Sequence, residues 1–371
     1  ASDLLVAPGF VDVHGDAFER QVSPRPGRIV DAELAVLDTD RQLAAAGITT
    51  AYHALTLSWE PGLRSVEQGE RFLSALDGVS DRVGVDHRVQ LRWETFAFEA
   101  IPLIETHLGH ARRPTLALND HLSMNLRPPG CSLLERPTDV ADADAFIDPT
   151  HPVARERFAK MATRSGIGQD GFDKVLRNVW ARRPAVPDTV RGLTAKAREG
   201  GVTIFSHDDN TIDARRRSAE FGATVVEFPM TRAVADDAHA DGVPIVLGSP
   251  NIVFGGSHTG AVNAADMIAE GLCDVLASDY HYPSMLMAAK RLTERGDPLI
   301  DTWHRLSLNA ARACGLEDRG MVRPGARADL ILLRWDEPVP SVVATIAAGR
   351  IVHLTEAWRL RSDAHATSAR A

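Results

Sequence analysis

The chain is organised around one stretch near its start, Pro8-Gly9-Phe10-Val11-Asp12-Val13-His14-Gly15-Asp16. In this stretch a turn dipeptide precedes a short run of Val and Phe, which is typical of a buried strand. His14 and Asp16 are two residues apart, so both side chains leave the same face of such a strand. An imidazole and a carboxylate at that spacing can hold a divalent metal ion. The simpler alternative is a strand followed by a polar turn.

Strands and helices alternate along most of the chain. Apolar residues at helical spacing from Asp31 to Ala46, followed by Gly47, predict a helix after the first strand. The repeated βαβ pattern predicts a parallel sheet, and eight repeats match a (β/α)8 barrel over residues 8–315. A doubly wound open sheet is the alternative, but it would carry a Gly-rich phosphate turn that this sequence lacks. The later strands are expected at 48–55, 87–94, 115–121, 202–207, 224–228, 243–248 and 274–279.

Two parts of the chain interrupt or follow this alternation. Breaks rich in Pro and Gly set off a helical insertion at about 126–200, where barrels keep lids and substrate loops. Residues 316–355 contain three short strands, which cannot bury a core alone. We expect them to form a small β-sandwich with residues 1–7, completed by a segment ahead of residue 1, or to pack on the barrel. The polar tail at 356–371 is expected to be disordered.

Composition narrows the class of function. A net charge of −9 argues against nucleic acid or an anionic membrane as the main partner, but not against a small anionic substrate. We find no apolar run long enough to span a bilayer and no secretion signal. Cys131, Cys273 and Cys314 are scattered, which favours free thiols in a reducing compartment and a cytoplasmic protein. The oligomeric state stays open, a homo-oligomer included.

Candidate metal ligands stand where the expected strands end, and barrel enzymes have their active sites at that rim. Each candidate has an ordinary alternative, because a His at a strand end often caps a turn and an Asp there often caps the next helix. Six such residues on one rim nevertheless predict a site for two divalent metal ions. They are His14, Asp16, Glu94, His121, His207 and Asp279.

Taken together, these motifs resemble the amidohydrolase superfamily, whose barrels hold one or two divalent metals. The similarity is closer to one branch, the α-D-ribose 1-methylphosphonate 5-triphosphate diphosphatases of the carbon–phosphorus lyase pathway, and it covers residues 8–351. The motifs that carry it are His14-Gly15-Asp16, Ser23-Pro24-Arg25-Pro26, Gly47-Ile48-Thr49-Thr50, Asp120-His121, Ser206-His207-Asp208-Asp209, Glu227-Phe228-Pro229, Pro250-Asn251-Ile252-Val253, Gly255-Gly256-Ser257-His258, Ser278-Asp279-Tyr280 and Asp318-Arg319-Gly320.

The resemblance implies a hydrolase that releases pyrophosphate from a ribose 5-triphosphate bearing a 1-phosphonate, by attack of metal-activated hydroxide. Zinc is the expected metal, with manganese and iron as alternatives. Asp279 would accept the proton of the attacking water. The expected assignment is His14, Asp16 and Asp279 on one ion, His121 and His207 on the other, and Glu94 bridging the two.

Further residues are expected to contact the substrate. Arg25, in a proline-stiffened loop, and Asp208 are two of them, and His258 would protonate the leaving group. The backbone amides of Gly255, Gly256 and Ser257 would bind phosphate, unless these residues form only a turn. Because several substrate-facing loops differ from the branch pattern, a cyclic amide, an N-acyl group or another phosphoester is the alternative substrate. A non-catalytic barrel used for binding is the second alternative.

Overall fold

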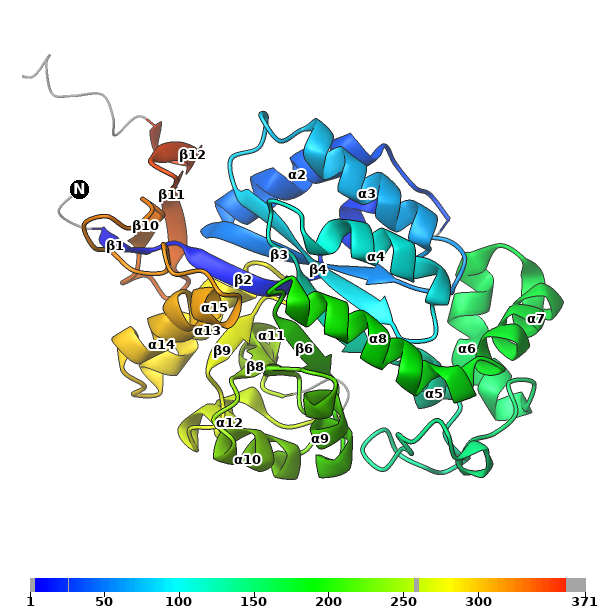
Figure 1. Cartoon of the computed structure of the whole chain (residues 1–371). Helices are drawn as coiled ribbons and strands as arrows, with labels where there is room; N and C mark the ends of the chain where they lie inside the picture. The colour runs from blue at the N-terminus through cyan, green and yellow to red at the C-terminus, as the bar shows by residue number, and fades with distance from the viewer. Residues whose placement is uncertain (1–3, 26, 257–259, 358–371) are drawn as a thin grey trace, which may run out of the picture.

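The structure, a computed structural model, describes residues 4–25, 27–256 and 260–357. Eight parallel strands run in the order β2 to β9, and an isolated bridge between Gly15 and Asp279 links the first strand to the last (Figure 1). The predicted barrel is therefore confirmed. Its strands are β2 (Phe10–Gly15), β3 (Ile48–Leu57), β4 (Asp86–Glu94), β5 (Thr115–Asn119), β6 (Ile204–His207), β7 (Val225–Glu227), β8 (Ile245–Gly248) and β9 (Val275–Ala277).

Helices lie outside the strands, as the alternating pattern predicted (Figure 1). The helix expected from Asp31 to Ala46 is α2, and the Asp31 side chain caps its first turn by accepting a hydrogen bond from the Leu34 amide. The helices are α1 (Glu19–Val22), α2 (Ala32–Ala45), α3 (Val66–Gly78), α4 (Ile101–Leu108), α5 (His121–Asn125), α6 (Pro152–Ser165), α7 (Gly168–Trp180), α8 (Val186–Glu199), α9 (Ile212–Glu220), α10 (Arg232–Ala240), α11 (Ser249–Phe254), α12 (Ala264–Ala269), α13 (Ser284–Glu294), α14 (Leu299–Leu306) and α15 (Leu308–Ala313).

Apolar side chains from distant strands meet in one buried cluster of the barrel. Val11 and Val13 of β2 share it with Phe205 of β6 and Val246 of β8, and all four are at most 1% exposed. Helix α15 adds Ala310 and its neighbours to the same cluster. Such burial removes apolar surface from water, which is the main favourable term in folding.

A small antiparallel sheet joins the start of the chain to its end. β1 (Leu5–Pro8) pairs with β10 (Leu330–Arg334), which pairs with β11 (Ser341–Ala347), and β11 pairs with β12 (Arg350–Leu354). Ile331 and Val342 of this sheet lie in the same apolar cluster as Leu43 of α2. The C-terminal strands therefore form a four-stranded sheet packed on the barrel, the second of the two expected arrangements, and β1 of the N-terminal segment supplies one of its strands.

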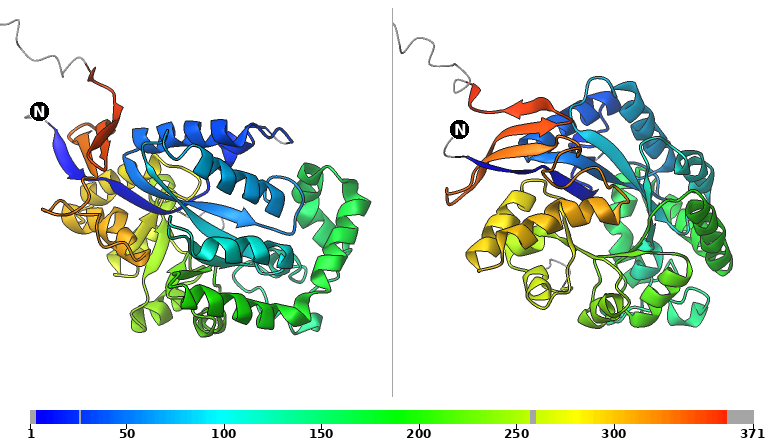
Figure 2. Two further views of the ribbon diagram at one scale, coloured as in Figure 1. Left: turned by 45° about the horizontal axis from the view of Figure 1, so that its top comes forward. Right: turned by 60° about the vertical axis from the view of Figure 1, so that its left-hand side comes forward.

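The insertion and the small sheet lie at opposite ends of the barrel (Figures 1 and 2). Helices α6 and α7 stand beyond the ends of the strands, beside the rim where the candidate ligands lie. Arg164 of α6 ties the insertion to the barrel through an ion pair with buried Glu60, at 2.6 Å between Nη2 and Oε1. Among the described residues, none of the helices combines the length and the apolar character needed to cross a membrane.

Candidate metal centre

The closure of the barrel brings the first and last strands together at the rim. The Asp279 amide donates to the His14 carbonyl at 2.9 Å, and the Asp16 amide donates to the Asp279 carbonyl at 2.9 Å. Asp279 adopts a left-handed backbone with φ of 54°, which costs a non-glycine residue of order 1–3 kcal/mol. Backbone strain of this kind persists where surrounding hydrogen bonds hold it, and it concentrates at functional sites.

Gly15 is required by the same closure. Asp12, fully buried in β2, accepts hydrogen bonds from the Ser278 amide at 2.9 Å and from the Ser278 hydroxyl at 2.5 Å. A Cβ atom on Gly15 would lie 2.6 Å from Asp12 Oδ2 and 3.0 Å from Ser278 Oγ. A larger side chain at position 15 would therefore disrupt the contact between Asp12 and Ser278, which holds the adjacent Asp279 in place.

Three of the predicted ligands converge here. One ligand atom each from His14, Asp16 and Asp279 lies within 4.8 Å of the other two. Burial and the neighbouring Asp16 carboxylate raise the pKa of Asp279 to about 7. Two carboxylates and an imidazole packed this closely favour a bound cation, because like charges repel in a buried site. The mixed nitrogen and oxygen donors suit zinc, manganese or iron, so these residues fit a divalent metal ion.

A second set of ligating groups is built around Glu227, which the sequence analysis did not propose as a site residue. Its Oε2 lies 3.0 Å from His14 Nδ1 and 2.8 Å from His207 Nδ1, and all three side chains are buried. The two imidazole rings stack with their centroids 5.3 Å apart. Glu227 thereby occupies the Nδ1 side of both rings and leaves their Nε2 atoms for other partners, as carboxylates behind metal-bound histidines do.

The charge on Glu227 is stabilised in place. Burial alone would raise the pKa of this carboxyl, but His14 and His207 outweigh burial and hold the pKa well below its usual range. Gln90 Nε2 donates to Glu227 Oε1 at 3.1 Å. Glu227 ends β7, directly before the left-handed Phe228, so a carboxylate at a barrel strand end was the signal that could have identified it.

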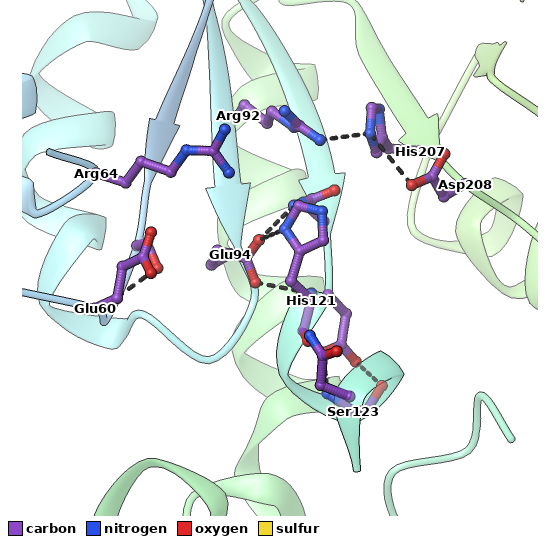
Figure 3. A network of polar contacts seen from close by, with 12 residues as sticks. Glu60, Arg64, Arg92, Glu94, His121, Ser123, His207 and Asp208 are labelled. Atoms are coloured by element: carbon purple, nitrogen blue, oxygen red, sulfur yellow. Dashed lines mark hydrogen bonds and ion pairs between the residues drawn. The ribbon is translucent and has the colours of Figure 1, made fainter. Parts of the chain in front are cut away.

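Glu94 and His121 lie together but apart from these two sets. His121 Nδ1 lies 2.5 Å from Glu94 Oε1, and the His121 amide donates to Glu94 Oε2 at 3.0 Å (Figure 3). Asn119 Nδ2 also donates to Glu94 Oε1. Within the described residues, the sets of three ligating side chains include neither Glu94 nor His121. The expectation that Glu94 bridges two ions stays a prediction.

Arg92 contacts one residue from each of the two ligand sets. Its Nη2 is 2.7 Å from His207 Nε2 (Figure 3). Its Nη1 is 3.9 Å from Asp16 Oδ2. Burial and the Arg92 charge lower the pKa of His207. Arg92 follows Gln90 and precedes Glu94 at two-residue spacing on β4, so all three side chains share one face of that strand. This polar stripe is the signal that could have pointed to Arg92.

A cavity of about 320 Å³ opens over these side chains. Asp208 lies on its wall, with Oδ2 3.6 Å from His207 Nε2, and it adopts a left-handed backbone with φ of 57°. The ligand candidates on the wall are His14, Asp16, His121, His207 and Asp279, and the cations are Arg64 and Arg92.

Three of the other expected substrate contacts are not among the residues that line this cavity. Arg25 is exposed and is not among the residues that line the cavity. Gly255 and Gly256 are also away from the cavity wall, although Asn251 of the preceding helix α11 belongs to it. Ser257 and His258 lie outside the residues that the structure describes.

Comparison with known proteins supports the fold and gives two functional relatives. The chain is 29% identical to the α-D-ribose 1-methylphosphonate 5-triphosphate diphosphatase of Escherichia coli over 332 residues, 88% of this chain and 82% of that enzyme. It is 42% identical to an adenine deaminase of Methylobacterium nodulans over 358 residues, or 95% of this chain. The chain spans only about half of that deaminase, 51% of its length. No family model matches the chain.

Solved structures share the fold at low sequence identity. An amidohydrolase from an environmental sample of the Sargasso Sea superposes with a TM-score of 0.59 at 16% identity, covering 98% of this chain and 85% of that one. An atrazine chlorohydrolase from Arthrobacter aurescens complexed with zinc gives a TM-score of 0.56 at 11% identity, covering 98% and 88%.

Proposed function

We propose that this chain, which belongs to the amidohydrolase superfamily, is a metal-dependent hydrolase that releases pyrophosphate from a ribose 5-triphosphate bearing a 1-phosphonate. The observation that carries the proposal is the set formed by His14, Asp16 and Asp279, whose ligand atoms lie within 4.8 Å of one another at the mouth of the barrel. The identity to a diphosphatase over 82% of that enzyme supports the choice of substrate.

These three residues would hold a divalent ion, and Glu227 would orient the imidazole of His14 from behind. A divalent ion in such a site supplies positive charge at the reacting phosphoryl group and lowers the pKa of a water molecule toward 7. Asp279 accepts a proton from the attacking water at its carboxylate. The resulting hydroxide then adds to the α-phosphorus, the bond from that phosphorus to the bridging oxygen breaks, and pyrophosphate leaves with the electron pair.

Arginine side chains favour an anionic substrate over a neutral one. Arg92 and Arg64 line the cavity of about 320 Å³, and guanidinium groups bind phosphoryl oxygens through charge-assisted hydrogen bonds. Arg64 is also paired with Glu19, at 2.8 Å between Nε and Oε1, which fixes its position.

A second cavity, of about 150 Å³, adjoins the first and shares His207 and Asp208 with it. Arg136 and Arg217 stand on its wall together with several aspartates. We assign this cavity to the ribose 1-phosphonate end of the substrate, because guanidinium groups suit the phosphonate and carboxylates accept hydrogen bonds from sugar hydroxyls.

The test is a pyrophosphate-release assay on the full chain loaded with zinc or manganese, using α-D-ribose 1-methylphosphonate 5-triphosphate. In ¹⁸O-labelled water, we expect the label in the ribosyl phosphate product and none in pyrophosphate, because attack occurs at the α-phosphorus. Orthophosphate as the first product, or label in pyrophosphate, would contradict the proposed attack.

Adenine deamination is the second candidate, favoured by the 42% identity to a deaminase over 95% of this chain. Adenine is a neutral substrate, so it gains less from the cationic wall of the cavity than a triphosphate does. Ammonia release from adenine, measured beside the pyrophosphate assay on the same preparation, separates the two candidates. Ammonia without pyrophosphate would assign the chain to deamination.

A further inference from the structure

We propose that the guanidinium of Arg92 takes the place of a second metal ion in this centre, so that the chain holds one divalent ion on His14, Asp16 and Asp279. The inference rests on the metal site of the proposed function, but it does not depend on the substrate. If this inference is correct, the two-ion centre that the sequence predicts does not form.

The coordinating nitrogen of His207 already contacts Arg92. Its Nδ1 lies 2.8 Å from Glu227 Oε2, so a neutral ring carries its proton there and has its lone pair on Nε2. That Nε2 is 2.7 Å from Arg92 Nη2, a distance at which it accepts a guanidinium hydrogen bond. A lone pair used in this way is not available to a cation.

Glu94 and His121, the other two residues that the sequence predicts as ligands of a second ion, also have protein partners. Glu94 and His121 contact each other at 2.5 Å, and Asn119 donates to the same carboxylate. The contacting atoms of both residues thus already have protein partners.

Arg92 also places a positive charge beside the predicted ligands. Arg92 is only 6% exposed, and its Nη1 stands 3.9 Å from Asp16 Oδ2. An arginine stays protonated at every pH of interest, so this site carries a permanent positive charge. A second divalent ion beside it would meet strong repulsion, since charges interact more strongly in a buried site than in water.

An arginine in this position would also act on the substrate. Arg92 lines the cavity, and its buried Nε has no hydrogen-bond partner among the described residues. A phosphoryl oxygen is a suitable acceptor for that donor, and the planar fork of a guanidinium matches phosphate geometry. Arg92 would therefore bind the anionic group that a second ion binds in a two-metal hydrolase.

The experiment counts ions without using activity. Full-length protein is stripped of metal, loaded with excess Zn²⁺ and desalted, and zinc per chain is measured by inductively coupled plasma mass spectrometry. We expect one equivalent in the wild type and in Arg92→Lys, which keeps the charge. We expect two equivalents in Arg92→Leu, because the repelling charge is gone and His207 Nε2 is then free to bind an ion together with Asp208 Oδ2, which lies 3.6 Å away.

Two equivalents in the wild type would overturn the inference, and so would a single equivalent in a folded Arg92→Leu variant. The matched control is Arg64→Leu, which removes another guanidinium from the wall of the same cavity and should leave the count at one. Should Arg92→Leu fail to fold, a zinc-edge anomalous map of wild-type crystals decides, with one peak expected and two peaks contradicting the inference.

The zinc count and the pyrophosphate assay together distinguish a failure of this inference from a failure of the proposed function. One bound zinc ion without pyrophosphate release would leave this inference standing and reject the substrate. Two bound ions with pyrophosphate release would reject only the role of Arg92. A wild-type protein that binds no zinc would reject both.

Discussion

The two halves of the barrel rim hold similar side chains in opposite electrostatic states. Where β2 and β9 end, the carboxylates of Asp16 and Asp279 face each other, and the pKa of Asp279 is raised to about 7 by burial and by Asp16. Where β4 and β5 end, Glu94 is paired with His121, and the pKa of Glu94 is lowered to about 2.

This difference in pKa indicates which half of the rim binds a metal ion. A carboxylate whose neighbours repel its charge is unstable in the metal-free protein and gains most when an ion binds. A carboxylate that already has an imidazole and an amide against it gains little. The same residue types at the same rim can therefore be ligands on one side and structural hydrogen-bond partners on the other.

The largest effect is expected for Asp279→Asn, in the half of the rim where two carboxylates face each other. The amide cannot accept a proton from the attacking water, so we expect turnover to fall by at least about 10³-fold, within the range of general acid–base effects. Turnover is measured by pyrophosphate release at saturating substrate on protein whose zinc content has been checked. Turnover within tenfold of the wild type would remove Asp279 from the mechanism.

Glu227→Gln tests whether the buried carboxylate supports the metal side of the rim. We expect metal affinity to fall by about 10–100-fold, because carboxylates behind metal-bound histidines have effects of that size. The measurement is competition with a chelating dye. Gln90→Leu is the control, since it removes only the 3.1 Å hydrogen bond to Glu227 and should weaken binding less. Equal affinities in Glu227→Gln and the wild type would contradict the role of this carboxylate.

The pH dependence of stability in the metal-free protein also tests Asp279. Here the Asp279→Asn substitution is expected to raise the stability of the protein, whereas it lowers turnover. Its pKa is about 7 in the folded protein, whereas an unfolded Asp titrates near 4. The folded state therefore binds the proton more tightly, and the contribution of this group to stability falls as pH rises from 4 to 7. Between pH 5.5 and 7 the loss amounts to at most about 2 kcal/mol.

Urea unfolding of metal-free wild type and Asp279→Asn at pH 5.5 and pH 8 measures this effect. We expect the variant to be the more stable protein at pH 8, with a smaller advantage at pH 5.5. Parallel pH profiles for the two proteins would show that Asp279 is not held in an unfavourable charge state.

The smallest effect on metal binding is expected for Glu94→Gln, in the other half of the rim. Loss of the charged hydrogen bond to His121 should lower the free energy of unfolding by about 1.5–3 kcal/mol. Zinc affinity should change by less than about tenfold, equivalent to ~1.4 kcal/mol. Loss of bound zinc in this variant would instead support Glu94 as a ligand and restore the two-ion centre.

Local sequence patterns were sufficient to predict the fold and part of the candidate site. The βαβ alternation predicted the barrel because strand and helix periodicities are properties of neighbouring residues. The same reasoning placed His14, Asp16, His207 and Asp279 at strand ends, and these residues line one cavity.

Other contacts had no local signature strong enough to identify them. The role of Glu227 could not be identified from the sequence, because it depends on two imidazoles from other strands. The role of Arg92 could not be identified either, because its guanidinium reaches His207 across 115 positions of the chain. The partner of the C-terminal strands was another such case, because β1 and β10 pair only once the barrel has brought the two ends of the chain together.

Which residues reach the rim follows from the order of residues along each strand, since alternation along a strand is fixed by backbone geometry. Which of them face a like charge and which face a partner depends on the folded barrel. That outcome depends on how the barrel closes, through contacts such as the hydrogen bond from Ser278 to Asp12, which joins residues 266 positions apart. Electrostatic interactions act over a few ångströms of space, whatever the separation along the chain, so the charge state of each carboxylate follows from the closed barrel.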